Sequence, residues 1–320
     1  MALSRKQRLQ FLQILLVIGL SVLCLYKIWD TAIVPIEQTL SWLNVVLNNA
    51  FFNKLLSSVV LLINIITFQR ILVKTALVNR DNLEPLVIYL LVSLMFPFLL
   101  LLPSLSLIFV LMFFVGQKIL AFSGIENPYS NFTIGLIVGI LSLIYRPLIF
   151  LLGFVFISYI VAKNFSWKYF LIPILGALLA YVYYYAILYI FDYNDWAQKF
   201  LSSFNHAFSL RPFTELKNNP QILIYVILYS LLIIVSMVKT VINLDKELIS
   251  RRKQLMVVML SLLLTMVLCL LFKDPQYLTF TVFVLLTVFQ LALSVDMFKY
   301  KQLVYIILVG LCVMNNMSLF

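Results

Sequence analysis

Seven polar side chains at predicted helix ends, or in the one long polar connection of the chain, carry its candidate chemistry. They are Arg146, Asp192, Asp195, His206, Arg211, Glu215 and Lys217. A guanidinium presents paired N–H donors that match phosphate oxygens, so Arg146 and Arg211 are candidate ligands of a lipid phosphate. Asp192 and Asp195 are candidate general bases, and His206 is the third candidate for a catalytic group. The alternative is that these are solvated loop residues and headgroup anchors.

A row of tyrosines on one predicted helix is the second candidate feature. Tyr181, Tyr185 and Tyr189 follow one another at four-residue spacing and therefore share a helix face. Counted back from Asp192, Tyr181 lies about 16 Å along the helix, which is too deep for a headgroup-level aromatic belt. The row therefore faces either a sugar or lipid ligand, or a neighbouring helix against which it packs. Both interpretations stay open.

The chain offers little for metal, cofactor or proton-pump chemistry. His206 is the only histidine, whereas zinc and iron sites commonly use several imidazoles. Cys24, Cys269 and Cys312 each stand alone in apolar runs without CxxC spacing. Phosphate-binding glycine loops and hydrolase triads are not found, and the apolar segments carry no charge at their centres. We expect no metal and no cofactor, and the residues name no reaction.

The elements that must position these residues are membrane helices. Hydrophobic residues make up 64% of the chain and charged residues only 11%, and the mean hydropathy is +1.08. Soluble domains do not have this composition, and helices satisfy their own backbone polar groups in lipid. We expect an all-α, polytopic transmembrane bundle of about eleven segments, each of roughly 15 to 24 residues, forming a single domain over residues 1–320.

The charge distribution indicates an orientation. The net charge is +11, but Lys and Arg lie between apolar segments instead of forming one patch, which favours a membrane surface over nucleic acid. About 16 of the 23 Lys and Arg residues fall on the side of the N-terminus. The positive-inside rule therefore predicts a cytoplasmic N-terminus and a C-terminus on the outer side.

The first half of the chain is predicted to contain two helices and two short hairpins. An uncleaved helix over 9–29 precedes an amphipathic helix over 31–54 in the outer interface, or an irregular loop there, and a span over 55–74. The hairpins cover 86–121, turning at Pro103-Ser104, and 131–162, turning at Tyr145-Arg146-Pro147. Their arms are shorter than the ~20 residues of a straight crossing, which indicates either a cavity near mid-membrane or a locally thin bilayer.

The second half begins with the tyrosine-bearing helix. That helix is expected over 168–191, followed by an outer loop over 193–219 and a polar connection over 241–254. Further spans are expected over 220–239, 255–272, 276–292 and 303–319. Asn219-Pro220 and Asp274-Pro275 are ordinary helix starts.

Three short motifs give the chain a family resemblance. They are Asn127-Pro128-Tyr129 with Tyr145-Arg146-Pro147, Phe165-Ser166-Trp167 with Gly176, and Arg251-Arg252-Lys253. The order of apolar and polar segments along the chain matches as well. In these features the chain resembles an integral membrane family of Bacteroidota that is catalogued only as a domain of unknown function. The resemblance implies a bacterial inner-membrane location and no particular activity.

Two functions stay open at this point. The first is the handling of an envelope lipid or a lipid-linked glycan in an outward-facing groove, with membrane lipids and a polyprenyl-phosphate-linked molecule as partners. In that case Arg146 and Arg211 would approach a shared anion above Tyr189, because two guanidiniums at one low-dielectric site require a negative charge between them. The second is a non-enzymatic scaffold subunit that binds partner membrane proteins.

Overall fold

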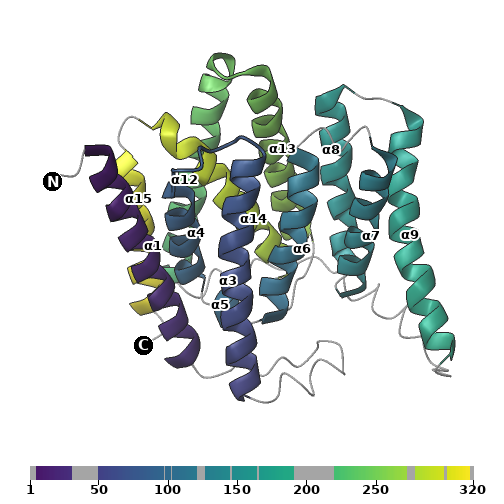
Figure 1. Ribbon diagram of the computed structural model, residues 1–320, viewed down its shortest axis with the longest axis horizontal. Coiled ribbons are helices and arrows are strands. Elements are labelled where there is room, and N and C mark those ends of the chain that lie inside the picture. Colours follow the sequence, from purple (N-terminus) through teal and green to yellow (C-terminus); the bar gives the residue numbers. More distant parts are fainter. Residues whose placement is uncertain are drawn as a thin grey trace. The chain divides into compact units, whose positions relative to one another are not determined.

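The computed structural model describes most of the chain as helices. The described residues are 5–30, 50–96, 98–101, 103–120, 127–144, 146–163, 166–190, 220–271, 278–298 and 301–317. Every regular element within these ranges is helical, which confirms the all-α prediction for them (Figure 1).

Five helices in the described ranges are long and apolar enough to cross a bilayer. They are α1 (Arg5–Asp30), α3 (Ala50–Lys74), α9 (Trp167–Ile190), α12 (Pro220–Asn243) and α13 (Ile249–Leu271). A helix of more than about 20 apolar residues spans the hydrocarbon core and leaves no backbone donor or acceptor exposed to lipid. These five helices make the chain a membrane-embedded helical protein.

The remaining helices are shorter. They are α4 (Glu84–Met95), α5 (Phe98–Leu101), α6 (Pro103–Leu120), α7 (Pro128–Ile144), α8 (Leu152–Ala162), α14 (Leu278–Ser294) and α15 (Lys301–Met317), with 3₁₀ turns η1 (Arg146–Leu151), η2 (Leu244–Lys246) and η3 (Val295–Met297). Pro103 and Ser104, predicted as the turn of the first hairpin, are instead the first two residues of α6, because proline suits the first position of a helix. The second hairpin turns where α7 ends and η1 begins. A total of eleven membrane segments stays a prediction.

Two predicted segments have different bounds in the structure. Residues 50–54, assigned to the interfacial helix over 31–54, are the first turn of α3, and residues 31–49 lie outside the described ranges. Most of the polar connection over 241–254 is helical, since α12 continues to Asn243 and α13 begins at Ile249. Arg, Lys and Gln are good helix formers, so α13 begins before its apolar part, whereas α12 continues through the apolar Val241 and Ile242. The outer loop over 193–219 also lies outside the described ranges.

The chain divides into two compact units. Unit 1 comprises residues 1–110, 213–255 and 284–320, and unit 2 comprises residues 111–212 and 256–283. Three of the four boundaries between them fall inside α6, α13 and α14, and the fourth lies outside the described ranges.

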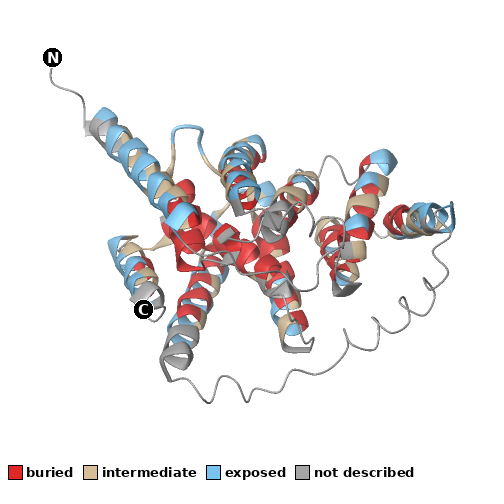
Figure 2. Cartoon of the chain, turned by 90° about the horizontal axis from the view of Figure 1, so that it is seen from below, coloured by how far each residue is buried: buried red, intermediate tan, exposed pale blue. Residues whose placement is uncertain are grey.

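The core of unit 1 is built on α4 and on the part of α14 that belongs to it. All residues of α4 from Pro85 to Met95 are buried, and so are the α14 residues from Val284 to Ser294 (Figure 2). The Phe68 ring of α3 stacks on Tyr89 at a centroid distance of 5.3 Å and meets Phe289 edge-on at 5.1 Å. These aromatic contacts hold α3, α4 and α14 together, because aromatic pairs gain energy beyond the area that they bury.

The core of unit 2 is the close contact of α7 with α9. Gly139 has no side chain, and a Cβ placed there would lie 2.7 Å from the Ala177 carbonyl oxygen and 2.8 Å from the Ala180 Cβ. Gly135 faces the backbone of Pro173 in the same way, and Gly176 faces that of Phe132. Small residues at four-residue spacing let two membrane helices approach backbone to backbone.

Candidate functional site

The register of α7 against α9 determines where the α7–α8 turn lies. Gly135 lies against Pro173 and Gly139 against Ala177, a constant offset of 38 residues, so the two helices run parallel. Continued to the end of α7, this register brings the turn that starts at Arg146 level with Tyr184 and Tyr185 on α9. The structure describes the backbone of Arg146 but not its side chain.

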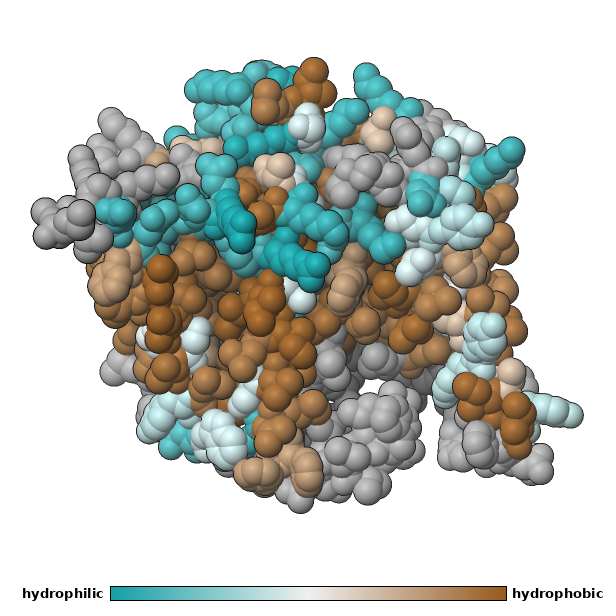
Figure 3. Space-filling view, viewed as in Figure 1, coloured by the Kyte–Doolittle hydropathy of each residue, from teal (hydrophilic) through white to brown (hydrophobic). Residues whose placement is uncertain are grey.

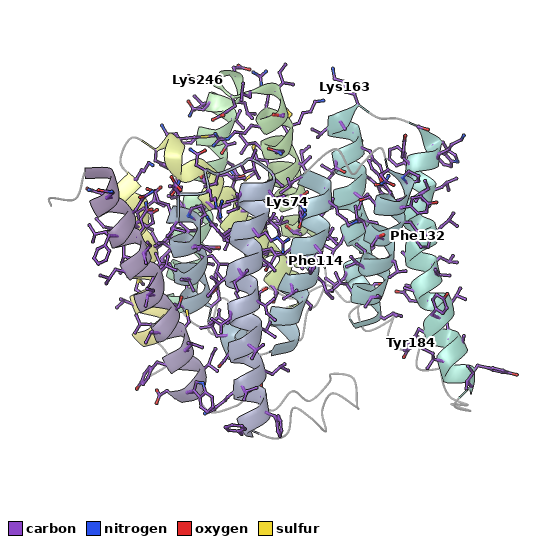
Figure 4. The ribbon with its side chains drawn as sticks, in the orientation of Figure 1. Lys74, Phe114, Phe132, Lys163, Tyr184 and Lys246 are labelled. Atoms are coloured by element: carbon purple, nitrogen blue, oxygen red, sulfur yellow. The ribbon has the colours of Figure 1, made fainter. Side chains whose placement is uncertain are left out.

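The tyrosine-bearing end of α9 forms an aromatic cluster. The rings of Tyr181 and Tyr185 lie 6.4 Å apart, and Tyr184 meets Tyr185 edge-on at 5.5 Å. All three are half-buried and the Tyr185 hydroxyl is buried, whereas Tyr189 is 79% exposed. Tyr181 and Tyr185 therefore lie next to each other on the face that their four-residue spacing predicts, Tyr189 does not join them, and Tyr184 is a member that this spacing alone does not reveal. Figure 4 shows Tyr184 near the far end of α9.

The other predicted site residues fall outside the described ranges. These are Asp192, Asp195, His206, Arg211, Glu215 and Lys217. The approach of Arg146 and Arg211 to a shared anion therefore stays a prediction. The described part of the candidate site is the backbone at Arg146 and the Tyr181–Tyr184–Tyr185 cluster, which unites an anion-binding residue type with phenol groups that can stack on a sugar or donate hydrogen bonds.

A second polar feature lies in unit 1, between α12 and α14. The Gln290 Nε2 donates to Thr240 Oγ1 at 2.8 Å and approaches Ser236 Oγ at 3.4 Å, and the hydroxyls of Ser236 and Ser294 are 2.6 Å apart. Seven residues earlier on each of these two helices, the hydroxyls of Tyr229 and Thr287 share a hydrogen bond. Polar side chains commonly hold membrane helices together in this way.

The spacing of these hydrogen-bonded pairs gives the relative direction of α12 and α14. Tyr229 pairs with Thr287 and Ser236 with Ser294, so a step of seven residues on α12 matches a step of seven on α14, and the helices run parallel. These four residues and Gln290 are buried. A seven-residue repeat of polar residues within apolar helices is the sequence signal that could have identified this contact.

The described residues provide no metal centre. No group of three or more His, Cys, Asp or Glu side chains occurs among them, and the three cysteines are free thiols. The Cys24 thiol is buried and points its sulfur at the Leu90 carbonyl oxygen, 4.0 Å away, which suits a small core residue.

Comparison with protein-family models, with curated proteins and with solved structures finds no match to this chain. The family resemblance and the bacterial inner-membrane location that it implies are therefore expectations. The α7–α9 register and the tyrosine cluster are the observations on which a function can be proposed.

Proposed function

We propose that this chain is a multi-pass protein of the bacterial inner membrane that binds an envelope lipid or a lipid-linked glycan in unit 2. The observation that carries the proposal is the parallel α7–α9 register, which brings Arg146 level with the Tyr184–Tyr185 pair. A phosphate at the α7–α8 turn would accept hydrogen bonds from the Arg146 guanidinium, and the tyrosines would contact the sugar or the rest of the headgroup.

A neighbouring apolar stripe on α9 suits the hydrocarbon tail of such a lipid. Leu171, Leu175, Leu178 and Val182 recur at helical spacing and are all exposed. Tyr181 and Tyr185 come three residues after Leu178 and Val182, so they lie on the adjacent face, about 60° around the helix. A polyprenyl chain can lie along the stripe while its phosphate stays at the tyrosine-bearing end.

Charge at the opposite end of unit 2 supports an outward-facing site. Three lysines lie at the end of unit 2 far from Tyr184, namely Lys118 at the end of α6, Lys163 after α8 and Lys168 at the start of α9. Figure 4 labels Lys163 and Tyr184 at these two ends. Lys118 Nζ donates to Ser130 Oγ at 3.4 Å, which ties the end of α6 to the start of α7. Under the positive-inside rule the lysine end is cytoplasmic and the tyrosine end faces outward, in agreement with the cytoplasmic N-terminus predicted from the whole chain.

A scaffold subunit is the second candidate function. Helix α1 has only 11% of its apolar window buried, and nothing lies within 4 Å of a Cβ built at Gly19. An exposed apolar helix with an open glycine allows a partner membrane helix to approach closely.

The test is native mass spectrometry of the purified full-length protein. A retained polyprenyl phosphate or glycolipid is expected for the wild type, lost in Arg146→Gln and weakened in Tyr185→Leu. Tyr183→Leu is the matched control, because Tyr183 lies on the same helix and is 61% exposed. Equal lipid retention in Arg146→Gln and wild type contradicts the proposal. A stoichiometric partner protein in place of a lipid favours the scaffold function.

A further inference from the structure

The turn between α12 and α13 combines projection, charge and exposed apolar side chains, and neither proposed function uses it. We define the α12–α13 tip as residues 239–253, all of which belong to unit 1. We propose that the tip binds the anionic phospholipid headgroups of the leaflet that it faces.

Three hydrogen bonds measure how far the tip projects. Ser236 pairs with Ser294, where α14 ends, and Gln254 Nε2 donates to the carbonyl oxygen of Thr75, just after the end of α3, at 3.1 Å. Thr240 of α12 still accepts a hydrogen bond from Gln290 of α14, so the last three residues of α12 and the first five of α13 extend beyond these neighbours, which corresponds to about 4–8 Å at 1.5 Å per residue. Figure 4 shows Lys246 on this turn, beyond Lys74 at the end of α3.

The projecting residues are predominantly basic. The tip carries five cations and two carboxylates, namely Lys239, Lys246, Arg251, Arg252, Lys253, Asp245 and Glu247. Both carboxylates are already paired, Glu247 with Arg251 and Asp245 with Arg252, each at 3.4 Å. Lys239 and Lys246 are exposed, so the tip presents net positive charge to whatever lies against it.

Large apolar side chains lie between these cations. Leu248 is 78% exposed and Ile249 is 74% exposed, at the point where the chain turns from one helix to the next. Figure 3 shows mainly hydrophilic side chains, with hydrophobic ones among them, at the end of unit 1 where this turn lies. Exposed apolar residues flanked by Lys and Arg are typical of segments that insert into the interface of an anionic membrane.

The distance to the bilayer favours lipid over a protein partner. The tip joins two candidate spans, Ile227–Lys246 and Ile249–Cys269, directly. A headgroup layer is about 5–8 Å thick on each side of the hydrocarbon core, and the tip projects by a similar distance. Its basic residues, with Leu248 and Ile249 among them, therefore lie at headgroup height.

The first experiment places a fluorophore on the tip of the full-length protein in nanodiscs. The native cysteines are replaced by alanine, and Leu248→Cys is labelled with an environment-sensitive dye. In discs that contain phosphatidylglycerol, we expect lipid-borne quenchers to quench the dye at position 248 but not at Asp245→Cys, since the Asp245 side chain is 94% exposed beside it. A dye at position 248 that stays in water in these discs overturns the proposal and leaves the face to an acidic protein partner or to none.

The second experiment tests the charge. Each Lys or Arg near an anionic surface strengthens binding about fivefold, so Lys239→Gln with Lys246→Gln should weaken phosphatidylglycerol binding by at least about tenfold. Lys239→Arg with Lys246→Arg keeps the charge and should bind like the wild type. Both pairs are compared by native mass spectrometry in a phosphatidylglycerol titration. Binding that is unchanged in the glutamine variant, or quenching that is equal in discs of phosphatidylcholine alone, shows that headgroup charge is not recognised and refutes the proposal.

Discussion

Replacement of Gly139 by alanine tests the close contact of α7 with α9 directly. The new Cβ would lie 2.7 Å from the Ala177 carbonyl oxygen and 2.8 Å from the Ala177 Cα, whereas ordinary contacts of this kind are 3.4–4 Å. Because both atoms belong to the backbone of α9, no rotamer change can make room. The two helices must separate by roughly 1 Å, and every contact along them loosens.

The net effect is the difference between two opposing magnitudes. Overpacking against rigid neighbours costs about 1–3 kcal/mol, and a backbone clash belongs at the upper end of that range. Alanine is a better helix former than glycine by about 1 kcal/mol, which offsets part of the cost. We expect Gly139→Ala to lower the free energy of unfolding by about 2 kcal/mol.

The measurement is equilibrium unfolding in mixed micelles as the fraction of sodium dodecyl sulfate rises, followed by circular dichroism and tryptophan fluorescence. Gly116→Ala is the matched control in the same unit, since nothing lies within 4 Å of a Cβ built at Gly116 on α6. That variant should be unchanged or more stable by up to about 1 kcal/mol. If the two variants respond alike, the helices are not in backbone contact and the register used to place Arg146 fails with them.

Three further outcomes are expected. In the same assay Thr240→Val should lower the free energy of unfolding by about 1–2 kcal/mol, because it leaves the buried Gln290 amide with only the 3.4 Å contact to Ser236. Gln290→Leu should lower it less, since it removes the donor together with the Gln290 Oε1, which has no hydrogen-bond partner. The reverse order would contradict the hydrogen bonds described between α12 and α14. Glu84→Gln should lower the free energy of unfolding by at most about 1 kcal/mol, since the 3.4 Å ion pair of Glu84 with Lys301 is partly exposed. In high salt the loss should be no more than a few tenths of a kcal/mol, because salt screens the pair. Reporter fusions at Ser203 and Asp245 should give opposite readouts, and the same side for both would refute the proposed orientation.

The lengths of the apolar runs were sufficient to predict the helices. Backbone groups in lipid must be paired within the segment, so an uninterrupted apolar run has one available conformation, and α1, α9 and α15 begin and end within a few residues of their predicted bounds. Where polar residues come after an apolar run the same reasoning fails. The basic residues at the start of α13 are good helix formers, so that helix begins at Ile249 in a stretch predicted to be a connection, and α12 continues into the same stretch through Val241 and Ile242.

Only the tertiary structure decided which helix faces which. Periodicity shows that Gly135 and Gly139 share a face, but the partner face on α9 is 38 residues away along the chain, and any small residue could have served. Ser236 and Thr240 carry the same ambiguity, because a hydroxyl in a membrane helix can bond to its own backbone, as Thr240 does to the Ser236 carbonyl oxygen at 3.0 Å. The exposure of Leu248 depends on where α3 and α14 end, which is a property of their packing against α12 and α13 and is not encoded locally in the tip.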